Sequence, residues 1–177
     1  MKRILIIGNA GSGKTTFAKK LSEKTGINLV HLDKMFWTGN WECVERNKFD
    51  EALQNELEKP EWIIDGNFNR TLTHRLKYCD TVFYFDIPTI ICLWGVTKRV
   101  IKSYGKTRDD MGGNCPEYFD KQKIELYRSV MSFKKQHSKK YREILSQSDN
   151  VDVVIFKSRR KAKKFLRKLN KSENTCL

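Results

Sequence analysis

Apolar residues occur along the chain in short runs that are separated by longer amphipathic segments. Five runs rich in β-branched or aromatic residues predict strands; they lie at 3–8, 28–32, 62–65, 81–86 and 151–156. Segments with helical spacing lie between or after them, at 15–25, 46–57, 89–103, 117–145 and 159–169. Strands that alternate with helices predict an α/β fold, with a five-stranded parallel sheet covered by helices on both faces.

The length of the chain and its apolar segments indicate one soluble domain. A chain of 177 residues can bury one sizeable core, which makes a second independent domain unexpected and assigns residues 1–177 to a single unit. The first apolar run is too short for the core of a signal peptide. The stretch 82–100 is interrupted by Asp86, Pro88 and Lys98, so it does not provide a membrane span. We therefore expect no membrane association.

The cysteines point to a reducing compartment. There are five, an odd number, and they are scattered with no Cys-x-x-Cys pair. This usage predicts neither a disulfide framework nor a zinc site, and it is typical of a cytoplasmic protein.

The positive charge lies mainly in the second half of the chain. Residues 1–100 hold 15 basic and 12 acidic groups, whereas residues 101–177 hold 20 and 9, so anionic partners are expected there. The segment 157–171 has nine basic residues, no acidic residue and an apolar stripe formed by Phe165, Leu166 and Leu169. It predicts a docked basic helix whose outer face is either simply solvated or binds nucleic acid or an acidic partner.

The strongest motif directly follows the first predicted strand. Residues 8–15 fit the pattern G-x-x-x-x-G-K-[ST] at every fixed position. Glycines allow successive backbone N–H groups to turn around phosphate oxygens, and the following helix directs its positive end at the same anion. The motif predicts binding of ATP and magnesium, with Lys14 at the β- and γ-phosphates and the Thr15 hydroxyl on the metal. The predicted nucleotide-binding residues are Gly8, Asn9, Ala10, Gly11, Ser12, Gly13, Lys14, Thr15 and Thr16.

Further segments resemble the adenylate kinases. The stretch 62–71 (WIIDGNFNRT) is similar to their Asp-Gly-Phe-Pro-Arg-Thr motif with one extra residue, and 82–88 (VFYFDIP) is similar to their fourth strand, which ends in Asp-x-Pro. Lys98 and Arg99 fall where their lid begins. His31-Leu-Asp33, Phe36-Trp37 and the Asp-Gly-Asn-x-x-Arg-Thr segment are closer still to the adenylate-kinase-related DNA topology modulation proteins (FlaR-like).

This resemblance implies a nucleoside-monophosphate-kinase-like fold with a short lid, and γ-phosphoryl transfer from ATP. It places Arg99 at the transferring phosphate and favours Asp65 over Asp86 as the carboxylate that holds a magnesium-bound water. Asp86 is then expected at the edge of the sheet, where it could cap the helix after Pro88. Arg108, in the glycine-rich stretch 104–116 that we expect to form the lid, is either a second phosphate clamp or a solvated charge.

The acceptor is expected beyond the carboxyl ends of the second and third predicted strands. Asp33 there either accepts a proton from an attacking hydroxyl or caps the next helix. Phe36, Trp37 and Trp41 either stack on a ring or belong to the core. The remaining candidates are Gly66, Asn67 and Arg70, whose guanidinium suits an anionic acceptor, and 34–60 is the expected acceptor-binding insertion.

Two features depart from adenylate kinases and bear on specificity. The glutamine that reads adenine in those enzymes is replaced by His74, and their threonine-glycine-aspartate start after the second strand is replaced by residues 31–34 (HLDK). AMP is therefore not the expected acceptor, and another nucleotide, a nucleoside or a small metabolite remains open. The competing hypothesis is an ATP-regulated DNA-binding protein. No recognised DNA-reading motif supports it, so only weak, non-specific nucleic-acid binding is expected.

Overall fold

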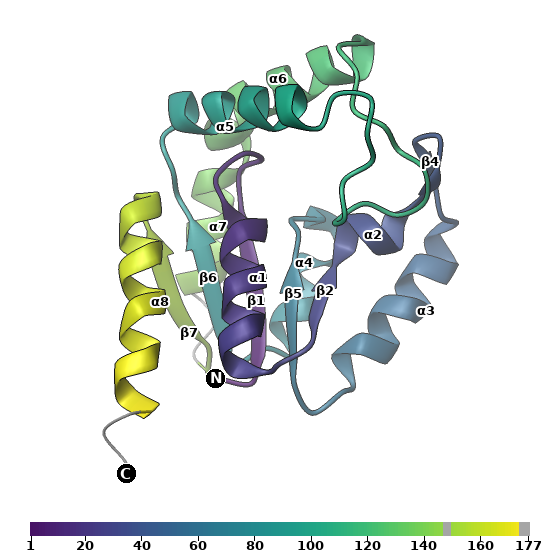
Figure 1. The fold of residues 1–177 in the computed structure, drawn as a ribbon. Helices are drawn as coiled ribbons and strands as arrows, with labels where there is room; N and C mark the ends of the chain where they lie inside the picture. Colours follow the sequence, from purple (N-terminus) through teal and green to yellow (C-terminus); the bar gives the residue numbers. More distant parts are fainter. Residues whose placement is uncertain (147–149, 174–177) are drawn as a thin grey trace.

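A computed structural model describes residues 1–146 and 150–173, with side chains up to residue 169. Its centre is a five-stranded sheet in the order β2-β5-β1-β6-β7 (Figure 1), and every neighbouring pair is parallel. The strands are β1 (Arg3–Gly8), β2 (Leu29–His31), β5 (Trp62–Asp65), β6 (Thr81–Phe85) and β7 (Asp152–Phe156). The predicted fold class and the five predicted strands are therefore confirmed.

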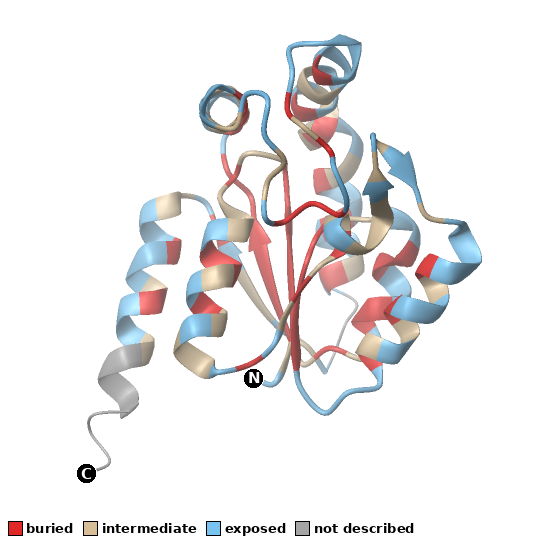
Figure 2. Cartoon of the chain, turned by 45° about the vertical axis from the view of Figure 1, so that its right-hand side comes forward, coloured by how far each residue is buried: buried red, intermediate tan, exposed pale blue. Residues whose placement is uncertain are grey.

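The alternation of side chains along β1 builds a core on each face of the sheet. Ile4 and Ile6 contribute to one apolar cluster, and Leu5 and Ile7 to the other. The first cluster is covered by α1 (Lys14–Thr25), α5 (Thr89–Lys102) and α8 (Arg159–Glu173), and the second by α3 (Arg46–Leu57), α4 (Asn69–Leu76) and α7 (Lys139–Ser146). Burial on both faces explains why the three central strands, β5, β1 and β6, are almost continuously apolar (Figure 2).

The helix expected over 117–145 is wrong in its extent. Helix α6 (Lys121–Phe133) begins only after Asp120, whose carboxylate accepts a hydrogen bond from the Lys123 backbone N–H at 3.0 Å. A π-helical turn, η1 (Lys134–Ser138), then separates α6 from α7. Glu117 does not start a helix; it pairs with Tyr104 in an isolated bridge and is buried.

Residues 32–43 form a short helix and a hairpin, which the spacing of apolar residues does not predict. Leu32 ends the second strand early because it begins the short helix α2 (Leu32–Phe36). The hairpin of β3 (Trp37–Gly39) and β4 (Glu42–Cys43) follows, and Asn40 and Trp41 turn between the strands with positive φ angles of 47° and 60°.

The segment 103–120 runs from α5 across the end of the sheet to this hairpin (Figure 1). The Asn40 backbone N–H donates to the Asn114 carbonyl at 2.7 Å, and the indole N–H of Trp41 donates to the Pro116 carbonyl at 3.2 Å. The lid predicted over 104–116 thus lies inside a loop that contacts the predicted acceptor-binding insertion. Within the described ranges, no helix has both the length and the apolar character needed to cross a bilayer.

Candidate active site

The loop between β1 and α1 has a backbone that only glycine adopts readily. Gly11 and Gly13 have φ angles of 69° and 103°, and a Cβ on Gly11 would lie 2.2 Å from the Cys92 carbonyl oxygen. The Ser12 N–H donates to the Asn9 carbonyl at 3.2 Å, which closes the turn. Since α1 begins at Lys14, its free N–H groups and positive end point into the same space.

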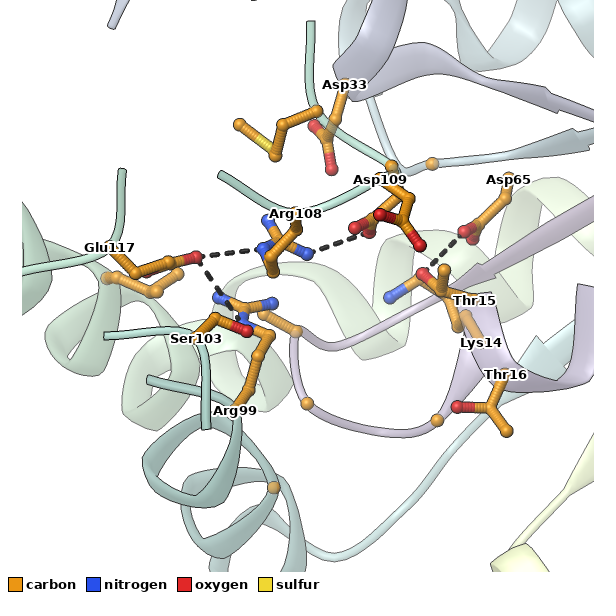
Figure 3. A pocket seen from close by; sticks show the side chains of 18 of the residues that line it. Lys14, Thr15, Thr16, Asp33, Asp65, Arg99, Ser103, Arg108, Asp109 and Glu117 are labelled. Atoms are coloured by element: carbon orange, nitrogen blue, oxygen red, sulfur yellow. Dashed lines mark hydrogen bonds and ion pairs between the residues drawn. The ribbon is translucent and has the colours of Figure 1, made fainter. Parts of the chain in front are cut away.

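Lys14 directs its ammonium into the cleft above this loop (Figure 3). Its Nζ donates to the Asn9 carbonyl at 2.9 Å. Burial lowers the pKa of Lys14, while the charges of Asp65 and Asp33 oppose that shift. A partly desolvated cation beside a loop that has the pattern of a phosphate-binding loop attracts an anion strongly.

Thr15 and Asp65 form the part of the cleft that fits a magnesium ion. The Thr15 hydroxyl donates to Asp65 Oδ2 at 2.7 Å, and His31 Nδ1 lies 3.3 Å from the same oxygen. The other oxygen, Asp65 Oδ1, is buried and has no hydrogen-bond partner among the described residues. A free carboxylate oxygen next to a hydroxyl is the hard-oxygen set that Mg²⁺ prefers, so these residues fit the metal.

Asp86 is engaged elsewhere. Lys134 and Arg142 lie 3.1 and 2.8 Å from its two oxygens and hold its pKa below the ordinary value despite burial. The predicted cap is wrong, because α5 has Pro88 at its N-cap and no side chain caps it. The structure therefore favours Asp65 as the carboxylate nearest the P-loop.

Two arginines meet over a buried carboxylate at the far wall of the cleft (Figure 3). Arg99, in the last turn of α5, and Arg108, in the lid, place their Nε atoms 3.8 and 2.9 Å from Glu117 Oε1. The second oxygen of Glu117 is 2.6 Å from Lys123 Nζ, and Arg108 also contacts Asp110 Oδ2 at 2.7 Å. Sequence reasoning missed Glu117, because its partners come from α5, the loop and α6, at spacings that no single helix or strand brings together.

The lid also contacts the helix that follows the P-loop. Asp109 Oδ2 lies 3.5 Å from Lys19 Nζ of α1. Both side chains are exposed, so this contact contributes little to stability. It nevertheless shows that the lid spans the mouth of the cleft from α5 to α1.

Asp33 faces the same cleft from α2, on the side opposite Arg99. Burial and the neighbouring charge of Asp65 raise the pKa of Asp33, against the charges of Arg108 and Lys14. Its alternative role as a helix cap is wrong, because Asp33 lies within α2, whose N-cap is His31. A carboxylate with a raised pKa and an open side is suited to accept a proton.

The predicted aromatic residues divide between cleft and core. Trp37 and Trp41 line the cleft, with their ring centroids 5.5 Å apart, together with Phe68. Phe36 is not among the lining residues; it packs against Trp37, Phe49 and Phe68. The cleft as a whole encloses about 1430 Å³.

The predicted residues after β5 also take different positions. Gly66 and Asn67 line the cleft, and the Asn67 side-chain oxygen accepts the Gly8 N–H at 2.9 Å, so it supports the P-loop. Arg70 is not brought to the cleft. Its two terminal nitrogens bind Asp50 of α3 at 2.6 and 2.8 Å, on the exposed side of α4.

Two further arginines position loops of the site. Arg159, at the start of α8, donates to the carbonyls of Ser12 and Gly11 at 3.2 and 2.5 Å. Arg75 is fully buried and donates to the carbonyls of Gly66, Asn67 and Phe68. Nothing in the local sequence distinguishes these arginines from surface charges.

A P-loop at the carboxyl end of the central strand of a five-stranded parallel sheet is an arrangement that this chain shares with solved P-loop kinases. Two solved shikimate kinases share the fold: that of Bacteroides thetaiotaomicron (TM-score 0.55, 15% identity, 98% of both chains) and that of Acinetobacter baumannii in complex with shikimate (TM-score 0.58, 17% identity, 99% of this chain and 94% of that one). At this identity the likeness concerns the fold alone.

In sequence, the chain is similar to the adenylate kinase of Thermotoga neapolitana. The two are 30% identical over 88 residues, which are 49% of this chain and 39% of that enzyme. The match therefore spans well under half of the length of that relative. No protein-family model matches the chain. The closer resemblance to the topology modulation proteins stays a prediction.

Proposed function

We propose that this protein is an ATP-dependent phosphotransferase that moves the γ-phosphoryl group of ATP to a small-molecule acceptor. One observation carries the proposal: the P-loop with Lys14, the paired arginines 99 and 108, and the carboxylate of Asp33 all face a single cleft. A nucleotide switch that only binds or hydrolyses ATP gives no role to an acceptor-side carboxylate such as Asp33.

In this proposal the residues divide the work of an in-line transfer. Lys14 and the P-loop N–H groups bind the phosphates, and Arg99 and Arg108 stabilise the charge of the transferring group. Asp33 orients the acceptor hydroxyl and accepts its proton. The lid excludes water, which would otherwise compete as acceptor. Magnesium, held by Thr15 and through water by Asp65, would neutralise charge on the phosphate oxygens.

The direct test is the Lys14→Ala variant. Because Lys14 supplies a cation at the phosphates, we expect turnover to be abolished and ATP affinity to fall sharply while the fold stays intact. Calorimetric ATP titration and a coupled assay of ADP release measure both effects. Lys48→Ala, on the exposed outer surface of α3, is the matched control and should behave as wild type. Unchanged ATP affinity and turnover in Lys14→Ala would remove the P-loop from the mechanism.

A further inference from the structure

The cleft is divided by charge. Cationic residues line it from α1, α5, α8 and the first part of the lid: Lys14, Lys19, Lys20, Lys98, Arg99, Lys102, Lys106, Arg159 and Lys163. The part formed by α2, the hairpin and the loop after β5 instead holds the carboxylate of Asp33 and the rings of Trp37, Trp41 and Phe68, with no lysine or arginine among its described lining residues. An anion is therefore attracted to the first part, whereas the second part offers it no cation and the carboxylate of Asp33.

The two cations nearest the second part are both ion-paired. Arg108 contacts the carboxylates of Glu117 and Asp110 at 2.9 and 2.7 Å. Lys123 is 2.6 Å from Glu117 and lies over the Trp41 ring at 4.2 Å. Arg70, whose fork would suit a phosphate or carboxylate, binds Asp50 outside the cleft. Among the described lining residues, the acceptor end therefore offers an anionic group no cation that is free of a carboxylate.

The same end offers flat apolar surface. Trp37 and Trp41 are half-buried and meet edge to face, while Met111 is buried in the lid beside them. Phe68 has a φ of 34°, a left-handed conformation that is strained for a residue with a side chain. The Arg75 guanidinium donates hydrogen bonds to three carbonyls of the loop after β5 and so fixes the position of that loop. The strained backbone keeps the Phe68 ring at the cleft wall.

We infer that the acceptor is an uncharged hydroxyl compound with a flat ring, of the nucleoside class, and is neither phosphorylated nor carboxylated. The inference rests on the proposed kinase function. In the transfer, the acceptor oxygen forms a bond to the γ-phosphorus, the bond from that phosphorus to the β–γ bridging oxygen breaks, ADP leaves, and the hydroxyl proton passes to Asp33. The aromatic rings of this end favour an acceptor with a flat ring, and the Asp33 carboxylate, in a part of the cleft without a free cation, disfavours a second anion.

The experiment compares matched acceptors with the full-length protein. ADP release is measured with each of the common nucleosides, with its 5′-monophosphate and with shikimate, which carries a carboxylate. Like charges brought together cost several kcal/mol, so we expect kcat/KM for the preferred nucleoside to exceed that for its monophosphate by about 100-fold or more. Preference for a monophosphate or for shikimate would overturn the acceptor class and leave the kinase function standing. Stimulation by none of these compounds would likewise overturn the acceptor class, whereas the kinase function itself is overturned only by unchanged ATP affinity and turnover in Lys14→Ala.

Two variants test the same inference through specificity. Trp37→Ala should raise KM for the nucleoside and leave KM for ATP unchanged, whereas Trp94→Ala, on the exposed face of α5, is the matched control. Asp110→Asn removes a carboxylate from Arg108 and should raise the ratio of monophosphate to nucleoside kcat/KM by about tenfold. An unchanged ratio in Asp110→Asn, or equal effects of the two tryptophan variants, would overturn the inference.

Discussion

Glu117 is the residue whose loss should perturb both stability and lid closure. Its side chain is fully buried, and its two oxygens contact Arg99, Arg108 and Lys123. Glu117→Gln keeps the size of the side chain and removes the negative charge. Three cations then face one another without their shared counterion.

The magnitude follows from the burial of the partners. The side chains of Arg108 and Lys123 are 13% and 5% exposed, while that of Arg99 is 26% exposed and can turn partly to solvent. Removing one partner of a buried ion pair costs about 3–5 kcal/mol. We expect the lower end, about 3 kcal/mol, which corresponds to a fall in melting temperature of about 6–12 °C for a chain of this size.

Thermal unfolding with and without ATP measures this effect, and limited proteolysis between residues 103 and 120 reports the lid. Glu51→Gln, at an exposed position on α3, makes the same chemical change and should leave both unaltered. Burial opposes the charge of Glu117, but the contact with Lys123 and the charges of Arg99 and Arg108 hold its pKa below the ordinary value. Its contribution is therefore present above the pKa of an unfolded glutamate and is lost as pH falls through the lower folded value. A melting temperature within about 1 °C of wild type at neutral pH, with unchanged proteolysis, would refute the reasoning.

Three other predictions concern the proposed site and the basic helix. Asp33→Asn should keep ATP affinity and lower the transfer rate by about 10²- to 10⁴-fold. It should also abolish the fall of the rate at low pH, because the raised pKa of Asp33 means that a higher pH is needed to ionise its carboxyl group. A near-normal rate would contradict this prediction. Arg159→Ala should weaken ATP binding about tenfold by freeing two P-loop carbonyls, whereas Lys161→Ala on the same helix should not. DNA titrations over several salt concentrations should give dissociation constants of about 10⁻⁴–10⁻⁶ M, with a slope that flattens in the double variant Lys161→Glu, Lys164→Glu. Nanomolar, sequence-selective binding that this variant loses would make DNA regulation the leading function.

The parts of the fold that the sequence predicts are those determined within a few residues of the chain. The three central strands, β5, β1 and β6, are short apolar runs buried on both faces, and the P-loop combines a glycine pattern with the helix that follows it. The hairpin was missed because its turn uses Asn40 and Trp41 in place of glycine. Helix α4 was missed because only two of its four buried residues, Leu72 and Leu76, are apolar, and the other two are Thr71 and Arg75.

The partners of charged residues depend on contacts that sequence spacing does not contain. Asp65 and Asp86 both end or follow an apolar strand, yet Asp65 meets Thr15 across 50 positions and Asp86 meets Arg142 across 56. Arg70 fits an anion-binding motif, but a carboxylate on the neighbouring helix α3 occupies its guanidinium. The identity of a charge can be predicted locally, whereas its availability to a ligand cannot.

Glu117 links the lid to the proposed transfer step through competition for the same two guanidinium groups. It holds Arg99 and Arg108 together at the cleft wall, which avoids the cost of assembling two like charges when the substrate binds. A γ-phosphate that reached the arginines would then share them with a carboxylate already in place. Full ion pairing with Glu117 would weaken the interaction of the two arginines with phosphate. Arg99 lies 3.8 Å from Glu117 Oε1, whereas Arg108 lies 2.9 Å from it. Arg99 is therefore the guanidinium that separates more readily from Glu117. On this argument, Arg99→Lys should reduce the transfer rate more than Arg108→Lys, while Arg108→Lys should cost more in thermal stability. If Arg108→Lys lowered the rate more and Arg99→Lys lowered the melting temperature more, then Glu117 would not determine which arginine binds the phosphate.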